Sequence, residues 1–592
     1  MDTEIEIGIP HRVCHLPLVM DVLRRTGLLS VVDQAVADDR RSKVSTSECV
    51  SVILCSVFVG HHDLWRMSDR LGPYDMATIM RDPDFRLSEF PEERLAKALD
   101  DLFRVGLDKM MTAVALQTIE QFRLGTDFLH FDTTSLSFFG AHERDDIGAL
   151  SDGISPPAPL VTYGYSKDHR PDLKQIMFGS LVSSDGGVPL FGQALDGNGS
   201  DSAAAAAFFQ RVRSLVREPR EVCCVADSKG WCARVLHVVQ GERLRLLSRL
   251  PRHHRLHREL MTRPWTSPRR IERSTEAKAR EPDYYEVIGY DVDEELTLEH
   301  PAEPPATKPR REILTVPARA VRVFSSALLR QKLATLTRIR EREGRSATAL
   351  LRDWQAMAYA CADDAQRAGE RHCAQADFLT LDVTAQVSVV EGPFKRGRGR
   401  PRKVPEPALA SNHYRVTYTT TVVTDEVSAA RLREQATFIL IRTRSPGWTI
   451  DDAELIDRYK GQYHNEHGFS WLKSGAGVRG INPIFLATPK RIAALCFLYL
   501  IGLMVSTLIQ RTVRAYLKKH GQGLPYRRNK PSDRITTRFL FELFPRVQTV
   551  PFSLAGGKTQ KKLVGVNPVI ELACTALGTR LSNLTPVMEN RP

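Results

Sequence analysis

The chain has 592 residues, of which 42% are hydrophobic and 26% charged, so we expect about three or four domains with buried cores. It carries 83 basic and 70 acidic residues, and this net charge of +13 favours a polyanionic partner. The 10 cysteines include no Cys-x-x-Cys pair, which argues against a structural zinc site and favours a reducing, cytoplasmic environment. We expect no signal peptide, because the first residues lack a basic segment followed by an apolar one.

Residues 1–125 are predicted to form a mostly helical N-terminal domain. Apolar residues recur at helical spacing through 47–71, where Thr46 or Ser47 can cap the helix, and another helix opens at Pro91. This domain can bind DNA, or it can be a scaffold that packs on a catalytic domain. The pattern leaves both alternatives open.

Strands and helices alternate over residues 126–250, which predicts a mixed α/β sheet. Within this region Asp132 and Asp227 each end an apolar, strand-like run. The expected strands cover 128–138, 175–182, 188–194, 221–226 and 244–250, and the expected helices cover 201–216 and 230–239.

Residues 251–435 interrupt this alternation and are predicted to be a large mixed α+β insertion. Proline and charge dominate 299–311, which favours a loop or linker, whereas 327–375 has a helical pattern. Two further strands are expected at 378–390 and 413–423.

The α/β pattern returns over residues 436–515, starting with a strand at 437–441. Residues 492–509 carry no charge and can be either a membrane span or a fully buried core helix. We favour the core helix, because no second segment of this kind exists and this one closely follows a polar helix. Residues 516–592 are predicted to be a basic, partly helical tail.

The polar helix before this segment carries three side chains at regular spacing. Thr449 or Asp451 can cap it, and Tyr459, Glu466 and Lys473 follow seven residues apart. On one continuous helix that spacing drifts by only ~20° per step, so the three side chains would share a face. A tyrosine, an anion and a cation on one face suit a polar site better than a hydrophobic core.

Asp132, Asp227 and Glu466 come from separate segments, as the carboxylates of a two-metal phosphoryl-transfer site do. Their hard oxygen ligands select Mg²⁺ or Mn²⁺, and two such ions would lie ~3.5–4 Å apart. Taken alone, each aspartate is weak evidence, because a single aspartate at the end of a strand is more often a turn or cap residue. The combination with a helical glutamate, a tyrosine and a lysine is much more specific.

These residues resemble the DDE transposases of bacterial insertion sequences, in the branch named for a Tyr-x2-Arg-x3-Glu-x6-Lys signature. The resemblance spans about 125–515 and follows a helical region of the type found ahead of such cores. The matching segments are Tyr459-x2-Gln462-x3-Glu466-x6-Lys473, Phe131–Ser135, Tyr165–Gln175, Gly197–Ser202 and Val225–Ser228.

The resemblance implies an α/β fold with an RNase H-like mixed-sheet core and cut-and-paste DNA transposition. It implies that Asp132, Asp227 and Glu466 are catalytic and bind two Mg²⁺ or Mn²⁺ ions, and that Tyr459 and Lys473 contact the transposon end. The expected partners are double-stranded DNA at the ends and the target, with a dimer in the DNA complex and no membrane. The expected location is the bacterial cytoplasm, at the nucleoid.

One position departs from the family signature: Gln462 stands where the family usually has arginine. Glutamine keeps hydrogen-bonding capacity but loses the charge and the bidentate fork. This places the phosphate-binding role of Gln462 in doubt without affecting the metal ligands. Lys460 or Lys473 can supply the positive charge that Gln462 lacks.

A second DNA-binding motif is predicted in the insertion, at Lys395–Lys403. Its Arg-Gly-Arg-Pro core resembles an AT-hook, because glycine lets an extended backbone enter a narrow minor groove while arginines line its floor. We favour this over a solvated basic loop. The predicted DNA contacts here are Arg396, Arg398, Arg400 and Arg402.

For several other side chains the sequence allows two alternative roles. Lys167, in a charged cluster before the second strand, can contact the DNA backbone or lie in a surface turn. His464 and His467 can bind metal, although hydrogen bonding fits better beside Mg²⁺. Trp448 and Trp471 can stack on a flipped base, but a packing role is favoured for Trp471.

The sequence therefore favours a cut-and-paste transposase that binds terminal inverted repeats. A catalytically impaired DNA-binding relic or repressor of the same element is an alternative from another class. A metal nuclease without sequence-specific ends is the third possibility.

Overall fold

The computed structural model describes residues 5–37, 42–61, 63–139, 158–273, 282–300, 309–391, 413–474, 480–481, 484, 486–526, 530–554 and 560–579. The chain divides into two compact units. Unit 1 contains residues 1–251, 292–319 and 441–592, and unit 2 contains residues 252–291 and 320–440. This division differs from the five segments expected from the sequence, because the N-terminal helices, the strands before residue 250 and the C-terminal residues fall in one unit.

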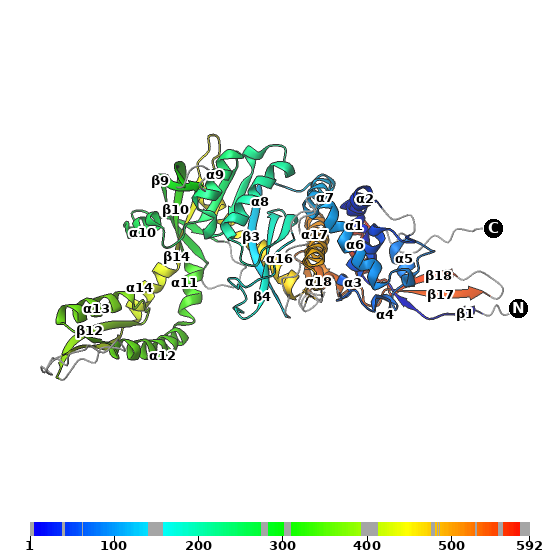
Figure 1. Ribbon diagram of the computed structural model, residues 1–592. Coiled ribbons are helices and arrows are strands. Elements are labelled where there is room, and N and C mark those ends of the chain that lie inside the picture. Colours follow the sequence, from blue (N-terminus) through cyan, green and yellow to red (C-terminus); the bar gives the residue numbers. More distant parts are fainter. Residues whose placement is uncertain are drawn as a thin grey trace. The chain divides into compact units, whose positions relative to one another are not determined.

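Unit 1 begins with a group of helices that pack around a long apolar helix, α17 (Figure 1). Their bounds are α1 Leu16–Arg25, α2 Leu28–Ala35, α3 Thr46–Phe58, α4 Met67–Leu71, α5 Met76–Met80, α6 Glu92–Val105 and α7 Leu107–Phe122.

The helix expected over 47–71 is shorter in the structure. Helix α3 ends at Phe58 and Gly60 follows in the left-handed region (φ 93°), which glycine adopts at low cost. Ser45 caps α3 in a capping box with Glu48, in place of Thr46 or Ser47.

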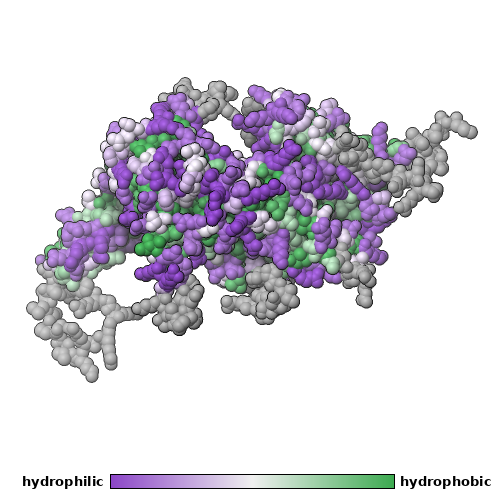
Figure 2. Space-filling model, turned by 90° about the horizontal axis from the view of Figure 1, so that it is seen from above, coloured by the Kyte–Doolittle hydropathy of each residue, from purple (hydrophilic) through white to green (hydrophobic). Residues whose placement is uncertain are grey.

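Helix α17 (Pro489–His520) contains the uncharged segment 492–509. Among the described helices it is long and apolar enough to cross a membrane, yet 94% of its most apolar 18 residues are buried inside the protein. The structure therefore favours the core-helix alternative. The face drawn in Figure 2 is mostly hydrophilic, with apolar side chains in small separate areas.

A nine-stranded sheet runs in the order β5-β4-β3-β6-β7-β14-β10-β9-β8. The first five strands belong entirely to unit 1, whereas β9, β10 and β14 contribute residues to both units. The strand bounds are β3 Phe128–Phe138, β4 Lys174–Ser183, β5 Pro189–Leu195, β6 Cys223–Ala226, β7 Arg245–Arg249, β8 Arg269–Glu272, β9 Tyr284–His300, β10 Arg310–Ser325 and β14 Thr437–Thr443.

The five strands within unit 1 form a mixed sheet, as the sequence predicts. Strand β4 is antiparallel to both β3 and β5, whereas β3, β6 and β7 are parallel to one another. Helix α8 (Asp201–Leu215) connects β5 to β6, and α9 (Ala233–Gly241) connects β6 to β7. Two parallel crossovers of this kind bring the carboxyl ends of β3, β6 and β7 to one edge of the sheet.

Unit 2 contains most of the expected insertion. Helices pack on a three-stranded sheet of order β11-β13-β12 around a small core that includes Trp354 and Tyr418. The elements are α10 Arg255–Thr262, α11 Ser326–Leu333, α12 Leu336–Gln355, β11 Ala358–Tyr359, α13 Ala362–Gln375, β12 Leu381–Val390, β13 His413–Val422 and α14 Asp425–Gln435.

One expectation for the insertion was wrong. The alternation of the earlier region was expected to stop at residue 251, but β9 and β10 are long strands of the main sheet. The consecutive acidic residues at 293–295 interrupt the apolar positions of β9, so its strand pattern was missed. Most of the expected linker 299–311 and all of Lys395–Lys403 lie outside the described residues, so DNA contact by Arg396, Arg398, Arg400 and Arg402 stays a prediction.

The remaining elements belong to unit 1. A C-terminal hairpin, β17–β18, pairs with β1 and β2 in a four-stranded sheet. The bounds are β1 Ile5–Ile7, β2 His11–Arg12, α15 Asp452–Lys460, α16 Tyr463–Ser474, β15 Leu524–Pro525, β16 Pro531–Ser532, α18 Thr537–Phe541, β17 Gln548–Leu554, β18 Gln560–Val564 and α19 Pro568–Leu577.

Candidate active site

Asp132 and Asp227 lie at the same level on neighbouring parallel strands. In the β3–β6 ladder His130 pairs with Val225, and continuing this register by two residues aligns the two aspartates. Asp227 directly follows β6 and keeps an extended backbone (φ −66°, ψ −174°). Neighbouring strands are separated by about 4.8 Å and residues two apart face the same side, so the two carboxylates are close neighbours on one face.

The face that carries Asp132 is covered by helix α16. Phe131 points to the other face, where its ring meets Phe208 of α8 at 5.0 Å. Ser180, the β4 residue opposite Asp132, donates a hydrogen bond to Asn465 of α16 (2.7 Å). Glu466 is the next residue along α16, so the structure brings all three predicted carboxylates to one region of unit 1.

The helix that carries Glu466 is not continuous with the one that carries Tyr459, which corrects the expectation of a single helical face. Helix α15 ends at Lys460 and α16 begins at Tyr463. Between them the Gln462 amide donates to the Tyr459 carbonyl (3.1 Å), a short i→i+3 bond that tightens the backbone into a turn. Asp451, one of the two expected caps, caps α15.

The site residues influence one another electrostatically. The pKa of Tyr459 is raised to about 12, chiefly by burial; Arg249 opposes this shift, and the charges of Asp227, Asp132 and Glu466 contribute to it. Burial also raises the pKa of Asp132 to about 6; Lys167 and the Thr133 amide oppose this shift, whereas Asp227 reinforces it. The phenol of Tyr459 is therefore neutral, and Asp132 holds its proton more tightly than an ordinary aspartate.

A fourth carboxylate, Asp201 at the start of α8, borders the site. Asp201 accepts a hydrogen bond from the Thr133 hydroxyl (2.5 Å) and pairs with Lys229. Lys167 lies 3.6 Å from Asp201 and 3.7 Å from Asp132, and its ammonium donates to the Thr133 carbonyl (2.7 Å). The Lys167 ammonium therefore lies among the carboxylates rather than on an open surface.

Arg249 is a further residue of the site that was not predicted from the sequence. It follows from the β6–β7 register, where Ala226 pairs with Ser248 and the next residues are Asp227 and Arg249. The end of a third parallel strand is the signal that could have identified it. Asp227 also acts as a cap residue, the alternative role considered from the sequence, because its side chain accepts a hydrogen bond from the Lys229 amide (3.0 Å).

Two predicted DNA contacts have partners within the protein. Lys473 donates a hydrogen bond to Asp168 (2.6 Å). Gln462 donates to the Phe131 carbonyl (3.2 Å), and its Oε1 is buried without a hydrogen-bond partner. Gln462 thus stabilises the backbone of the residue before Asp132.

Trp471 and the two histidines named from the sequence have other surroundings in unit 1. The ring of Trp471 is 7% exposed and packs against Phe58 and Tyr499, which agrees with the packing role. His464 and His467 line a cavity of about 730 Å³ together with Trp471 and the basic end of α17. Among the described residues, no three His, Cys, Asp or Glu side chains are grouped as a ready-made metal site.

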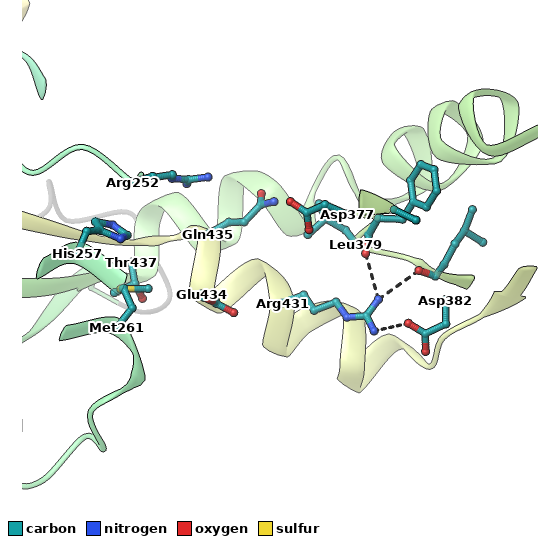
Figure 3. A pocket seen from close by; sticks show the side chains of 13 residues that line it. Arg252, His257, Met261, Asp377, Leu379, Asp382, Arg431, Glu434, Gln435 and Thr437 are labelled. Carbon is teal, nitrogen blue, oxygen red and sulfur yellow. Dashed lines mark hydrogen bonds and ion pairs between the residues drawn. The ribbon is translucent and has the colours of Figure 1, made fainter. Parts of the chain in front are cut away.

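Unit 2 has a cavity of its own, of about 410 Å³ (Figure 3). Arg431 points from α14 across it and donates to the carbonyls of Phe378 and Leu381 and to Asp382. Arg252, Asp377 and Glu434 also line the cavity. Both acidic and basic side chains line this cavity, and Arg431 is already hydrogen-bonded to protein groups. We therefore assign these residues a role in stabilising the fold rather than in binding an anion.

Comparisons with known proteins identify no family for the whole chain. Residues 10–116 match a family described as a domain of unknown function, DUF4277. No curated protein matches the chain. A solved structure of the piggyBac transposase, in a synaptic complex with hairpin DNA, is 12% identical over 52% of this chain and 63% of that chain, with a TM-score of 0.25. The chain thus spans less than two thirds of that protein, and a similarity this weak carries no weight for function.

Proposed function

We propose that the chain is a metal-dependent DNA transposase of an insertion sequence, with Asp132, Asp227 and Glu466 as its catalytic carboxylates. The observation that carries the proposal is the alignment of Asp132 and Asp227 on parallel strands, under the helix that bears Glu466. Three carboxylates at a sheet edge are suited to phosphoryl transfer on DNA.

The strand order supports an RNase H-like core. A three-stranded antiparallel meander, β3-β4-β5, leads through α8 into β6 and through α9 into β7, with both later strands parallel to β3. This is the mixed-sheet arrangement that the resemblance implies for the catalytic core.

The donor set fits a divalent cation. Carboxylate oxygens are the ligands that Mg²⁺ and Mn²⁺ prefer. The pKa of Asp132 is raised chiefly by burial, and the charges of Asp227 and Asp201 add to this shift, so a bound cation would stabilise the ionised carboxylate. Asp132, Asp227 and Glu466 would hold the ions. When bound, such ions supply charge neutralisation and an activated water or 3′-hydroxyl.

The other residues would position DNA. Tyr459 keeps its proton at neutral pH and can donate a hydrogen bond to a phosphate oxygen. Lys167 and Lys229 place positive charge beside the carboxylates, where a phosphodiester would enter. We propose that the enzyme cuts its terminal repeats and joins them to target DNA as a dimer, in the bacterial cytoplasm at the nucleoid.

The test is cleavage of labelled duplex that carries the element's terminal repeats, with Mg²⁺ or Mn²⁺, by the wild type and by Glu466→Gln. The proposal predicts metal-dependent cuts at the repeat ends that disappear in the variant, and no degradation of random duplex. Degradation of both duplexes would indicate a nuclease. Specific binding without cutting by either protein would indicate the relic or repressor.

A further inference from the structure

A third cavity, of about 440 Å³, lies in unit 1 at the edge of the sheet opposite the carboxylates. Arg245 begins β7 and pairs with Cys223, the first residue of β6, whereas Asp227 follows the last. Four residues of strand separate these two levels, which is about 13 Å at 3.3 Å per residue. The cavity is therefore distinct from the candidate active site.

Four arginines line this cavity, and none of its lining residues is acidic. They are Arg220, Arg243, Arg245 and Arg444, and Thr443 and Ser445 add hydroxyl groups. Arg444 also lies 3.5 Å from Asp293, which does not line the cavity. The guanidinium of Arg245 lies over the ring of Trp448 (5.1 Å), and its buried Nε has no hydrogen-bond partner. Its Nη1 donates to the Glu221 carbonyl (3.4 Å), which helps to fix the guanidinium in place. A guanidinium held in this way suits an anion.

Arg243 gives a second, independent indication. It follows the last turn of α9 with φ 57°, in the left-handed region, at the position where glycine usually ends a helix. A side chain there costs roughly 1 kcal/mol relative to glycine. Strain retained at an exposed position points to a role for the side chain. The alternative to ligand binding is a structural role, in which the positive charge of Arg243 stabilises the C-terminal end of the α9 dipole.

We propose that this arginine pocket binds the phosphate backbone of double-stranded DNA, away from the scissile phosphate. The inference rests on the proposed function for the choice of DNA. The four arginines come from three separate segments, at 220, 243–245 and 444, so they can contact successive phosphates. Such contacts add affinity without reading sequence.

The test uses the full chain, a fluorescent random duplex and EDTA, with anisotropy measured between about 50 and 200 mM NaCl. Arg243→Gly should raise the melting temperature, because it removes the strain, and yet lower the slope of log K against log salt by about 0.9. Arg220→Gln should lower the slope similarly. Lys109→Gln, which removes the same charge from an exposed position on α7, is the matched control and should change it less.

An unchanged slope in Arg243→Gly, with the expected gain in stability, would overturn the proposal and leave the helix-dipole role. Tight binding of inorganic pyrophosphate, lost in both arginine variants while duplex binding is unchanged, would instead identify a small polyphosphate as the occupant. Binding is measured without metal and therefore does not depend on DNA cleavage. If the carboxylates fail to cut DNA, the salt dependence of binding still tests the arginine pocket separately.

Discussion

Asp132 combines partial burial with carboxylate neighbours, and its raised pKa sets the pH range in which a cation can bind. A proton competes with the cation for the same oxygens up to about pH 6. We predict that Mn²⁺ at 100 times its Kd adds about 2.7 kcal/mol to the free energy of unfolding, and that this gain grows as the pH rises through about 6. Thermal unfolding with and without Mn²⁺ measures it.

Without a cation the sign is opposite. The folded state keeps the Asp132 proton above the ordinary pKa of 3.8, so stability falls as the pH rises from there through about 6, by at most ~1.4 kcal/mol per pH unit. Asp132→Asn should remove both effects, whereas the exposed Asp353→Asn should retain them. Equal Mn²⁺ stabilisation in Asp132→Asn would contradict the assignment.

Gln462 is predicted to act on the fold rather than directly on DNA. Its amide donates to the Phe131 carbonyl, next to Asp132, and a hydrogen bond of this kind contributes about 1 kcal/mol. Gln462→Ala should therefore lower the free energy of urea unfolding by about that amount and leave the affinity for duplex DNA unchanged. A variant of normal stability that binds DNA more weakly would restore the phosphate-contact role expected from the family signature.

At the scale of elements, a buried carboxylate ties the C-terminal hairpin to the N-terminal helices. Asp75 caps α5, its side chain is 4% exposed, and Lys561 of β18 donates to both oxygens at 2.8 and 2.9 Å. Burial acts to raise the Asp75 pKa, but hydrogen bonds from Lys561, Thr549 and Thr78 outweigh it and lower the pKa.

We predict that Lys561→Met costs about 2–3 kcal/mol at neutral pH, because it leaves a buried charge without its partner. A lowered pKa means that the contribution is present above the ordinary pKa and is lost as the pH falls through the folded-state value. The difference from wild type should thus shrink in acid, in urea unfolding at each pH. Lys562→Met, at the exposed neighbouring position, should have little effect at either pH.

Strand β5 and helix α17 meet at a position where only glycine fits. A Cβ on Gly192 would lie 2.6 Å from Leu500 Cδ2 and 3.1 Å from the Gly179 carbonyl oxygen. Since Leu500 is fully buried, Gly192→Ala should lower the free energy of unfolding by about 1–3 kcal/mol. Gly241→Ala, where a Cβ meets nothing within 4 Å, should be neutral or stabilising. Equal effects of the two substitutions would contradict this packing.

Sequence periodicity was sufficient to locate the strands that hold the aspartates, because buried strands leave long apolar runs. It did not locate β9, whose apolar positions are interrupted by the acidic run at 293–295, or the break at Gly461–Gln462, where the Gln462 side chain donates to the distant Phe131 carbonyl. Register is also a property of the folded sheet. Hence the alignment of Asp132 with Asp227, and the position of Arg249 beside them, emerged only from the structure.

At the scale of the whole molecule, the candidate site draws on three separate segments of the chain, and all of unit 2 lies between the second and third carboxylates in sequence. The central claim is that these segments surround one metal site. Iron-mediated cleavage of the chain tests it most directly: Fe²⁺ replaces the bound ion, and peroxide then cuts the backbone nearby. We predict cuts near residues 132, 227 and 466 that excess Mg²⁺ suppresses and Asp227→Asn abolishes. Cuts elsewhere, or cuts that persist in Asp227→Asn, would contradict the account.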